Sequence, residues 1–395
     1  MHISQRQLFF SHVAQTSPEP LALEIEKAEG SYLYGTDGKQ YLDFISGISV
    51  SNVGHRHPKV IAAIQEQLNK HMHVMVYGEF IQSPQVKLAT ALSQTLPGNL
   101  DSIYFVNSGT EATEGAIKLA KRATGRKKLI AFKNSYHGST NGALSLMSDE
   151  YFSSAYLPLL PHVEFLNPND ESELPKIDNE TAGVFVELIR GECGAVPLDQ
   201  SFVTKLKNQC EQVGALLIVD EIQSGFGRTG KFWACEHFDL MPDVLLMAKG
   251  MGGGMPIGAF AAKHSLMKEL SHNPVLGHIT TFGGHPVSCM ASLATLEVVA
   301  EILKTNHIQE CEAIIREELK HPKIKSINGK GLLLAAELSS KEENFGFIKA
   351  CINDGMITDW FLFADHKFRI APPLTITIED LRKGLAIIRK NLGSN

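Results

Sequence analysis

Short apolar runs alternate with helical patterns through the middle of the chain. Seven of these runs are rich in valine, isoleucine, leucine and phenylalanine and show little alternation with polar residues, which is typical of strands buried on both faces. They cover residues 103–106, 128–132, 163–166, 183–188, 215–220, 244–248 and 258–262. Helical windows such as 111–124 and 199–213 lie between them and give the β-α-β rhythm of a mostly parallel sheet. We therefore predict a large α/β domain over residues 58–286.

The last part of the chain has a different pattern, with helices first and strands afterwards. Helices are predicted at 285–304 and 308–320, and strands at 331–338, 356–360 and 367–370. A final helix should begin after Thr377, which can cap its N-terminus, with Glu379 and Asp380 in the first turn. We expect a smaller α+β domain over 287–395. Residues 1–57, with the hairpin-like segment GSYLYGTDGKQYLDF, should pack with this smaller domain.

Composition and charge exclude several classes of protein. The chain has 395 residues with 37 basic and 43 acidic side chains, and its net charge of −6 argues against a general nucleic-acid binder. We find no apolar run that approaches the ~18–20 residues of a membrane span, and no secretory leader at the N-terminus. The six cysteines are far apart and show no zinc-binding spacing, so we expect reduced thiols in a cytoplasmic protein. The two H-x-H pairs do not complete a coordination shell, so we expect no metal.

A glycine-rich segment at 225–231, GFGRTGK, matches both G-x-G-x-x-G and G-x-x-x-x-G-K, two patterns of nucleotide-binding loops. Phe232 follows it, however, where a P-loop has the hydroxyl residue that holds Mg²⁺. The glycines begin five residues after the predicted strand end at Asp220, and the next strand ends in Lys249 rather than in an acid for a ribose hydroxyl. We therefore expect no nucleotide at this loop.

Chemically useful side chains stand where three predicted strands end, which is the edge at which open parallel sheets bind ligands. Ser108, Gly109 and Thr110 lie between a strand and a helix, where hydroxyls and free N–H groups suit a phosphate or form an ordinary helix cap. Asp220 ends an apolar strand, where a carboxylate needs a partner, either a structural cation or a cationic ring nitrogen. Lys249 enters a glycine-rich turn, where it is either a surface side chain or a Schiff-base amine with a pKa lowered by desolvation.

Together, these features meet the needs of pyridoxal phosphate, which requires a phosphate anchor, a partner for its pyridine nitrogen and a Schiff-base amine. Tyr136-His137-Gly138 follows the strand predicted at 128–132 and offers an aromatic ring that can stack on the pyridine. The sequence therefore predicts pyridoxal phosphate at the carboxyl ends of the strands.

These residues lie within longer blocks that resemble the class III aminotransferases, which include the acetylornithine, ornithine and ω-amino-acid aminotransferases. The resemblance covers nearly the whole chain, and its most specific pair of blocks is DEIQSGFGRTG followed by AKGMGGGMPIGAF. The other blocks are YLDFISGISVSNVGHRHP, NSGTEATEGAIKLAKRATGR, NSYHGST, TTFGGHP and RIAPPLTIT. The resemblance implies the fold-type I pyridoxal phosphate transferase fold, an α/β architecture, and a homodimer with shared active sites.

Roles for individual residues follow from the same resemblance. Lys249 resembles the Schiff-base lysine that also moves a proton, and Asp220 resembles the partner of the pyridine nitrogen. Gln223 matches the residue near the phenolic oxygen of the ring, and Thr281 matches a threonine that reaches the phosphate of the neighbouring subunit. The remaining cofactor-binding residues expected from the blocks are Ser108, Gly109, Thr110, Tyr136, His137 and Glu187.

The substrate side departs from the family pattern. Relatives acting on acetylornithine, ornithine or lysine carry arginine after the aromatic-His-Gly triplet, where this chain has Ser139, and ornithine enzymes carry tyrosine where it has Ile48. Arg369 matches the family arginine that pairs with the glutamate at Glu192 or moves to a substrate carboxylate. We expect it to bind the carboxylate of the acceptor. Arg190, in place of a glutamine, either supplies a second cationic contact or points to solvent.

The resemblance thus implies a pyridoxal-phosphate-dependent aminotransferase that moves an amino group, expected to be a terminal one, from an amino acid or amine to a 2-oxo acid. The reaction would be ping-pong, with 2-oxoglutarate or pyruvate as the acceptor. An aminomutase or a decarboxylating enzyme of the same fold is an alternative, which product identity would reveal. From another class, a non-catalytic ligand sensor is conceivable, although such proteins carry a DNA-binding extension for which we expect no room here.

Overall fold

The computed structural model describes residues 3–393; residues 1 and 2 of the predicted segment 1–57 and residues 394 and 395 of the predicted domain 287–395 lie outside the described range. The middle of the chain forms a seven-stranded sheet. All neighbouring strands are parallel except that β12 runs antiparallel to both of its neighbours. The order is β4 (Ser102–Val106), β12 (Gly258–Ala262), β11 (Val244–Met247), β10 (Leu216–Asp220), β7 (Thr181–Val186), β5 (Lys128–Phe132) and β6 (Val163–Leu166). The seven predicted strands are confirmed, and so is the mostly parallel α/β architecture.

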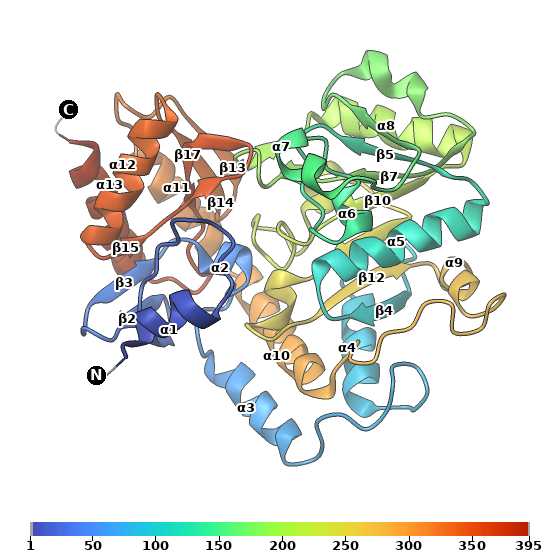
Figure 1. Cartoon of the computed structure of the whole chain (residues 1–395), viewed down its shortest axis with the longest axis horizontal. Coiled ribbons are helices and arrows are strands. Elements are labelled where there is room, and N and C mark those ends of the chain that lie inside the picture. Colours follow the sequence, from blue (N-terminus) through green and yellow to red (C-terminus); the bar gives the residue numbers. More distant parts are fainter. Residues whose placement is uncertain (1–2, 394–395) are drawn as a thin grey trace.

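Helices cover both faces of this sheet, as Figure 1 shows for α5 (Gly109–Thr124) and α8 (Gln200–Val213). α5 packs against β7, β11 and β12. It begins at Ser108, whose side chain accepts a hydrogen bond from the Glu111 N–H, and it ends at Gly125, whose φ of 68° suits glycine. α8 packs against β10, so both predicted helices are confirmed.

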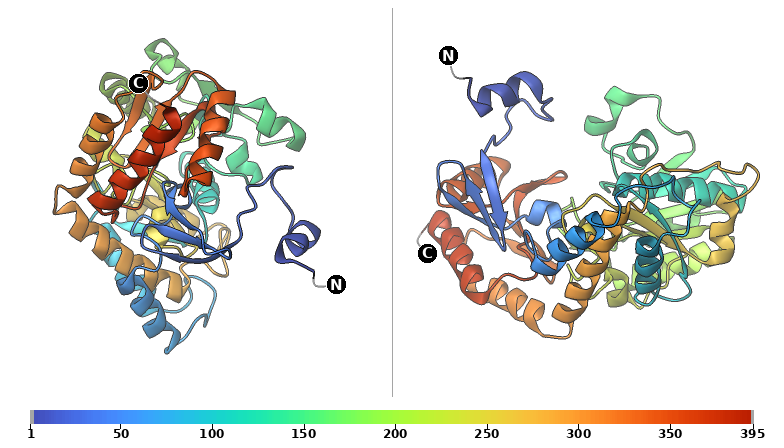
Figure 2. Two further views of the ribbon diagram at one scale, coloured as in Figure 1. Left: turned by 90° about the vertical axis from the view of Figure 1, so that its left-hand side faces the viewer. Right: turned by 90° about the horizontal axis from the view of Figure 1, so that it is seen from below.

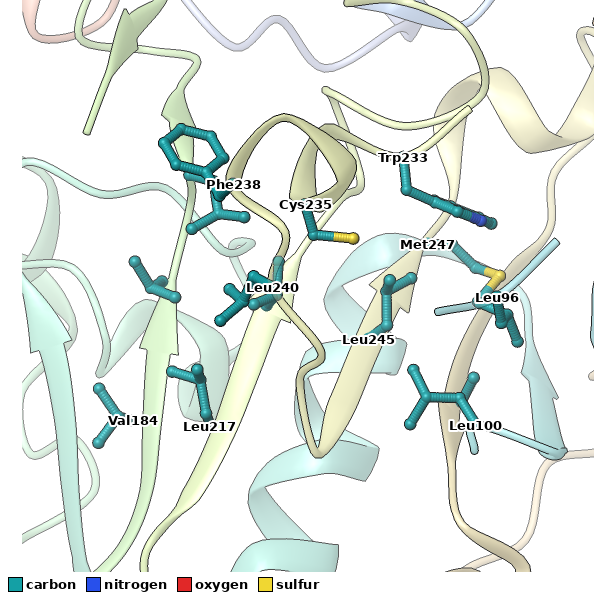
Figure 3. Packing of buried hydrophobic residues seen from close by; sticks show 14 of the residues in the cluster. Leu96, Leu100, Val184, Leu217, Trp233, Cys235, Phe238, Leu240, Leu245 and Met247 are labelled. Atoms are coloured by element: carbon teal, nitrogen blue, oxygen red, sulfur yellow. The ribbon is translucent and has the colours of Figure 1, made fainter. Parts of the chain in front are cut away.

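The largest hydrophobic cluster lies between the sheet and the α8 side of the domain. Figure 3 shows side chains of β7, β10 and β11 that meet side chains from the segment between β10 and β11. On the opposite face, Ile218, Leu246 and Phe260 pack against α5 in a second cluster. Residues on both faces of these strands are therefore buried, which explains why their sequences are apolar without alternation. The labelled members of the first cluster include Val184, Leu217, Leu245, Met247, Trp233, Phe238 and Leu240.

A second, antiparallel sheet forms near the C-terminus. Its order is β13 (Ser326–Lys330), β14 (Leu333–Glu337), β17 (Ala364–Ile370) and β16 (Trp360–Phe361), and helices α11 (His307–Glu318), α12 (Lys341–Asn353) and α13 (Ile378–Leu392) accompany it. The predicted N-cap is confirmed, because the Asp380 N–H donates to Thr377 Oγ1 at 3.0 Å. Strand β13 was missed because its sequence, SINGK, has one apolar residue and two poor strand formers.

The N-terminal strands extend towards this C-terminal region rather than towards the large sheet (Figure 1). A third sheet has the order β1 (Ile25–Glu29), β2 (Tyr32–Gly35), β3 (Gln40–Asp43) and β15 (Met356–Ile357), with β3 and β15 parallel. The Tyr32 hydroxyl also donates to Asp380 Oδ1 at 2.5 Å. The predicted hairpin is formed by β2 and β3. The domain boundaries at 57 and 286 stay a prediction.

Helix α10 (Pro286–Leu303) lies between the two regions and packs against α3 (Pro58–Leu68) and α4 (Ser83–Ser93). Its mean hydropathy of 1.5 over 18 residues would suffice for a membrane span by length and composition, so the expectation of no such run was wrong for this helix. However, 61% of it is buried inside the protein, as is usual for a core helix. The polar residues that a helical pattern would place on an outer face are few because α10 has neighbours on several sides.

Short elements complete the fold. Helix α1 (Gln5–His12) begins with a capping box between Ser4 and Gln7 and stands apart from the three sheets, as Figure 2 shows. The other short α-helices and strands lie in connecting segments; they are α2 (Ser46–Ser49), α6 (Asn141–Leu144), α7 (Glu150–Ser153), α9 (His264–Met267), β8 (Ile189–Arg190) and β9 (Val196–Pro197). Short 3-10 helices also lie there, namely η1 (Ser154–Tyr156), η2 (Glu171–Lys176), η3 (Ala234–Phe238), η4 (Lys249–Gly252) and η5 (Lys268–Leu270).

Candidate active site

A cavity of about 490 Å³ opens at the carboxyl ends of the parallel strands. Its walls are the segments that directly follow β4, β5, β7, β10 and β11. This is the edge at which open α/β sheets bind ligands, because the loops there change from strand to strand while the sheet holds them in place. The predicted site residues that line this cavity are Ser108, Gly109, Thr110, Tyr136, His137, Glu187, Glu192, Asp220, Gln223 and Lys249.

Lys249 lies at the start of the turn after β11, and it lines the cavity. Its φ of 42° is in the left-handed region, which is uncommon for a residue with a side chain. The glycines that follow are required for close packing, since a Cβ on Gly250 would lie 2.3 Å from Asn52 Nδ2. Burial lowers the pKa of Lys249 from its ordinary value, which increases the fraction of neutral, nucleophilic amine.

Asp220 and His137 form a buried pair at the floor of the cavity. His137 Nδ1 lies 2.7 Å from Asp220 Oδ2, and the Ile222 N–H donates to Asp220 Oδ1 at 2.9 Å. Burial opposes charge on His137, but the hydrogen bond and the charge of Asp220 outweigh it and raise the pKa of the imidazole. Within residues 3–393, the Nε2 atom of His137 has no hydrogen-bond partner. Asp220 is therefore held in one orientation by its own neighbours.

The N-terminus of α5 forms one end of the cavity with Ser108, Gly109 and Thr110. A 16-residue helix presents free N–H groups and the positive end of its dipole there, which suits an anion. Thr110 Oγ1 lies 2.7 Å from Thr140 Oγ1. Gly138 lies close by with a φ of 133°, and a Cβ there would come 2.3 Å from Thr110 Oγ1. The backbone at Gly138 thus leaves no space for a side chain beside the anion-binding end.

Glu187 supports the segment that carries Tyr136. The Tyr136 N–H donates to Glu187 Oε2 at 3.2 Å, and the Gly191 N–H donates to Glu187 Oε1 at 3.1 Å. Burial raises the pKa of Glu187 to about 7. The Tyr136 hydroxyl lies 3.0 Å from Ser139 Oγ, so the serine that replaces the expected arginine is in contact with the aromatic residue.

A second cavity of about 450 Å³ adjoins the first and shares Tyr136, Glu192 and Lys249 with it. Arg369 lines this cavity, and its Nη2 lies 3.3 Å from Glu192 Oε1. Gln223 Nε2 donates to the same Glu192 oxygen at 3.0 Å. Burial alone would raise the pKa of Glu192, but the charges of Arg369 and Lys249 hold it below the usual range. The predicted Arg369–Glu192 pair is therefore present.

Arg190 does not reach either cavity. Its side chain is buried and turns towards the backbone of the segment after β5, where Nη2 donates to the Lys133 carbonyl at 2.5 Å. It also lies 2.9 Å from Cys193 Sγ. Arg190 therefore neither supplies the expected second cationic contact to the cavities nor points to solvent. The sequence could not show this, because the acceptors are backbone carbonyls from a loop 56 and 57 residues away.

Thr281 also lies outside both cavities of the chain. It is exposed, and its carbonyl lies 3.0 Å from His73 Nε2. An exposed position is compatible with the contact to a neighbouring subunit that the family resemblance implies, and that contact stays a prediction.

Asp359 is a residue of the second cavity that the sequence patterns did not single out. Arg369 Nε donates to Asp359 Oδ1 at 2.7 Å, which is shorter than either contact between Arg369 and Glu192. The one available signal is that a buried arginine requires carboxylates. The sequence contains many acids near Arg369 and does not show which one faces it.

The glycine-rich segment 225–231 is a structural loop. Arg228 within it is fully buried and donates to three parts of the chain, namely Asn52 Oδ1, the Leu332 carbonyl and the Pro372 carbonyl. The loop thus connects the N-terminal segment with the C-terminal region. It lines neither of the two cavities.

Pyridoxal phosphate fits the first cavity. An anion-binding helix end with a glycine that admits no Cβ, a carboxylate held at the floor and a lysine with a lowered pKa all face the same space. These are the phosphate anchor, the ring-nitrogen partner and the amine that this cofactor requires. In residues 3–393, no group of three or more histidines, cysteines, aspartates or glutamates is arranged to hold a metal ion.

Known proteins similar to this chain are aminotransferases. Residues 13–392 match the family described as Aminotransferase class-III. The chain is 38% identical over 379 residues to an acetylornithine aminotransferase of Archaeoglobus fulgidus, covering 95% of this chain and 97% of that one. It is 38% identical over 326 residues to a [LysW]-aminoadipate semialdehyde/glutamate semialdehyde transaminase of Sulfurisphaera tokodaii, covering 80% and 82%. The ornithine aminotransferase of Toxoplasma gondii, solved with partial occupancy of PLP at its active site, superposes with a TM-score of 0.90 at 28% identity, covering 98% and 94%.

Proposed function

The chain belongs to the class III aminotransferases, which are pyridoxal-phosphate-dependent transaminases, and we propose that it moves a terminal amino group of an amino acid or amine to a 2-oxo acid such as 2-oxoglutarate or pyruvate. The observation that carries this proposal is the position of Lys249. It lies on the wall shared by the cofactor-sized cavity and the second cavity, with Asp220 on one side and the Arg369–Glu192 pair on the other.

Pyridoxal phosphate, when bound, supplies an electron sink for the carbon that loses and gains a proton. In this proposal Lys249 would hold the cofactor covalently and move that proton with its Nζ. Asp220, oriented by His137, would be the partner of the ring nitrogen and keep it protonated. Tyr136, supported by Glu187, would stack on the ring, and Gln223 would serve the phenolic oxygen. Ser108, Gly109 and Thr110 would hold the phosphate.

Arg369 is proposed to bind the carboxylate of the acceptor, with Glu192 as its partner when the amine end of the donor is in the cavity. One arginine can serve both half-reactions, because its guanidinium can bind the carboxylate of Glu192 or that of the acceptor in a similar geometry. The contacts to Glu192 support this, since distances of 3.3 and 3.5 Å are long for a charge-assisted hydrogen bond and leave the pair free to exchange.

Donors with a terminal amine are supported by the relatives, one of which is an acetylornithine aminotransferase and another an ornithine aminotransferase. We expect this chain to recognise the end of its donor away from the reacting amine differently from the acetylornithine and ornithine aminotransferases. Ser139 and Ile48 line the two cavities at the positions where the family resemblance implies arginine and tyrosine, and neither supplies a charge for an α-carboxylate.

We also propose a homodimer in the cytoplasm. Thr281, outside its own cavities, would then reach the phosphate of the neighbouring subunit. Exposed apolar side chains on the segments around it support an interface there, namely Phe80, Ile81, Val275, Leu276, Ile279 and Phe282. All six cysteines are free, which is compatible with a reducing compartment. Light scattering during size-exclusion chromatography should give twice the mass of the chain, and a monomer would contradict the shared site.

The direct test is the near-visible absorbance of the purified holoenzyme, recorded before and after single donors are added without an acceptor. The donors differ in the group at the end of the molecule away from the reacting amine; they are ornithine, acetylornithine, lysine, β-alanine, 4-aminobutyrate and simple diamines. A donor that reacts should bleach the band in a half-reaction. A band that no donor bleaches would count against transamination, and no band after addition of pyridoxal phosphate would overturn the proposal.

A further inference from the structure

Asp359, between β15 and β16, and Arg369, in β17, are held next to each other by hydrogen bonds of the backbone. The Arg369 N–H donates to the Asp359 carbonyl at 2.9 Å, and the hydroxyl of Thr358 donates to the Arg369 carbonyl at 2.6 Å. Both side chains then meet at the wall of the second cavity. The position of the pair is therefore fixed by hydrogen bonds to the backbone of both residues.

The guanidinium of Arg369 makes a short hydrogen bond through Nε, here called the firm edge, and longer contacts through Nη1 and Nη2, here called the loose edge. On the firm edge, Nε donates to Asp359 Oδ1 at 2.7 Å. On the loose edge, Nη2 lies 3.3 Å from Glu192 Oε1 and Nη1 lies 3.4 Å from Gln223 Oε1. Its flat face covers Phe361, with 4.2 Å from the guanidinium carbon to the ring centre. Only the Nη edge is thus available to an incoming carboxylate.

Two carboxylates face this one guanidinium. The charged side chains that line the second cavity are Glu192, Asp359, Arg369 and Lys249. In the amino form of the enzyme, which meets the acceptor, Lys249 is not bonded to the cofactor. It must then be a neutral amine in order to take up a proton, and burial lowers its pKa, so it offers no charge to a substrate carboxylate. An acceptor carboxylate that displaces Glu192 from the Nη edge replaces one negative charge by another, while Asp359 stays on Nε.

The first cavity adds no cation that is free to bind a second carboxylate. Among the residues in 3–393 that line it, His137 is already paired with Asp220, and the other charged side chains are Glu187, Glu192, Asp220 and Lys249. Ser139, at the position where the family resemblance implies arginine, is hydrogen-bonded to Tyr136. A second carboxylate on a substrate would therefore lie among acidic groups, with Arg369 already shared between Asp359 and the first carboxylate. Like charges in such a poorly solvated space repel each other strongly.

We propose that Asp359 is a specificity-determining residue that restricts the acceptor to 2-oxo acids with a single carboxylate. This inference rests on the proposed function and narrows its acceptor to the pyruvate class. Asp359 acts through Arg369 and by its own charge, and it touches no reacting atom. Its effect should therefore appear in which acceptor binds, as a change in apparent affinity.

The test uses the amino form of the enzyme, prepared by adding pyridoxamine phosphate to the apoprotein so that no donor is needed. Pyruvate or 2-oxoglutarate is then added, and the return of the near-visible band gives a rate and an apparent dissociation constant for each acceptor. For the wild type, the ratio of the rate to the apparent dissociation constant should be at least about tenfold higher with pyruvate than with 2-oxoglutarate. Asp359→Asn keeps an oxygen for Nε and removes the charge, so the preference should fall at least about tenfold, through tighter apparent binding of 2-oxoglutarate.

Asp365→Asn is the matched control, because Asp365 lies on the same strand as Arg369 but pairs with Lys341 away from the cavities. This variant should keep the wild-type preference. Equal use of both acceptors by the wild type overturns the proposal without any variant, and so does an unchanged preference in Asp359→Asn. If the amino form reacts with no 2-oxo acid and no donor bleaches the holoenzyme, the proposed function itself fails.

Discussion

His137 Nδ1 lies 2.7 Å from Asp220 Oδ2, and both side chains are buried at the floor of the cofactor-sized cavity. The backbone N–H of Ile222 holds the other carboxylate oxygen. Because the carboxylate is fixed from both sides, its free lone pairs are directed by the protein and need no ligand to orient them. A cofactor that binds through a ring N–H thus finds its acceptor already in place.

Removal of this support should weaken cofactor binding. His137→Phe deletes a charge-assisted hydrogen bond of Asp220, and we expect the dissociation constant for pyridoxal phosphate to rise roughly ten- to a hundredfold. His137→Asn keeps a donor near the position of Nδ1 and should retain most of the affinity. Titration of the two apoproteins with the cofactor, followed by absorbance, measures both constants. Equal constants for the two variants would show that the hydrogen bond is unimportant.

Lys249→Ala should lower the rate of the donor-driven absorbance change at least about a thousandfold, since it removes both the amine and the proton carrier of the proposed reaction. Lys263 offers a matched control, because it also directly follows a strand of the sheet but is exposed. Lys263→Ala should react like the wild type. Stopped-flow absorbance gives both rates, and a Lys249→Ala enzyme with near-normal turnover would refute the assignment.

Stability should depend on pH through Glu221, which lies outside the two cavities. Burial raises the pKa of Glu221 from 4.5 to about 7. Between these pH values the folded state binds a proton that the unfolded state has lost, so the contribution of Glu221 to stability falls as the pH rises through this window. The fall should reach about 3 kcal/mol at pH 8 relative to pH 4.

Glu221→Gln cannot ionise and should lack this dependence. Urea titration from pH 4 to pH 8 gives the unfolding free energies of the wild type and of Glu221→Gln. As the pH rises, the unfolding free energy of the wild type should fall relative to that of Glu221→Gln. A difference that stays constant across the series would mean that Glu221 has an ordinary pKa in the folded protein.

Arg228 should be important for stability rather than for catalysis. Its substitution by alanine leaves Asn52 and two buried carbonyls without donors, which should cost about 3 kcal/mol or more of unfolding free energy. Arg228→Lys keeps the charge and can reach only some of the acceptors, so it should lose less. Urea unfolding distinguishes the two, and a loss of under about 1 kcal/mol for Arg228→Ala would contradict the connecting role.

The residues of the cofactor cavity could be predicted because they are attached to the strongest sequence signals. Asp220 and Lys249 terminate apolar runs that can only be buried strands, and Ser108 begins a strongly amphipathic helix. Parallel strands bring their carboxyl ends to one edge, so the pattern along the chain already determines which side chains meet. Family resemblance added roles to these residues but was not needed to bring them together.

The residues of the substrate cavity were harder to predict because their placement depends on irregular backbone. Asp359 comes after the two-residue strand β15, and its contact with Arg369 follows from an antiparallel pairing that no periodic pattern marks. For Arg190, the two alternatives of a cationic contact in the cavity and a side chain in solvent both differ from the structure, because its acceptors are carbonyls of a loop distant in sequence. Such contacts depend on tertiary structure, which local propensities do not encode.

The central claim is that this protein transfers nitrogen from a donor amine to a 2-oxo acid. The most direct measurement uses a donor that bleaches the holoenzyme, labelled with ¹⁵N at its terminal amine, together with pyruvate. Mass spectrometry of the products should find the label in alanine and the donor converted to the corresponding aldehyde or ketone with all its carbons. Loss of carbon dioxide from the donor, or label retained in an isomer of the donor, would contradict transamination and indicate a decarboxylating enzyme or an aminomutase of the same fold.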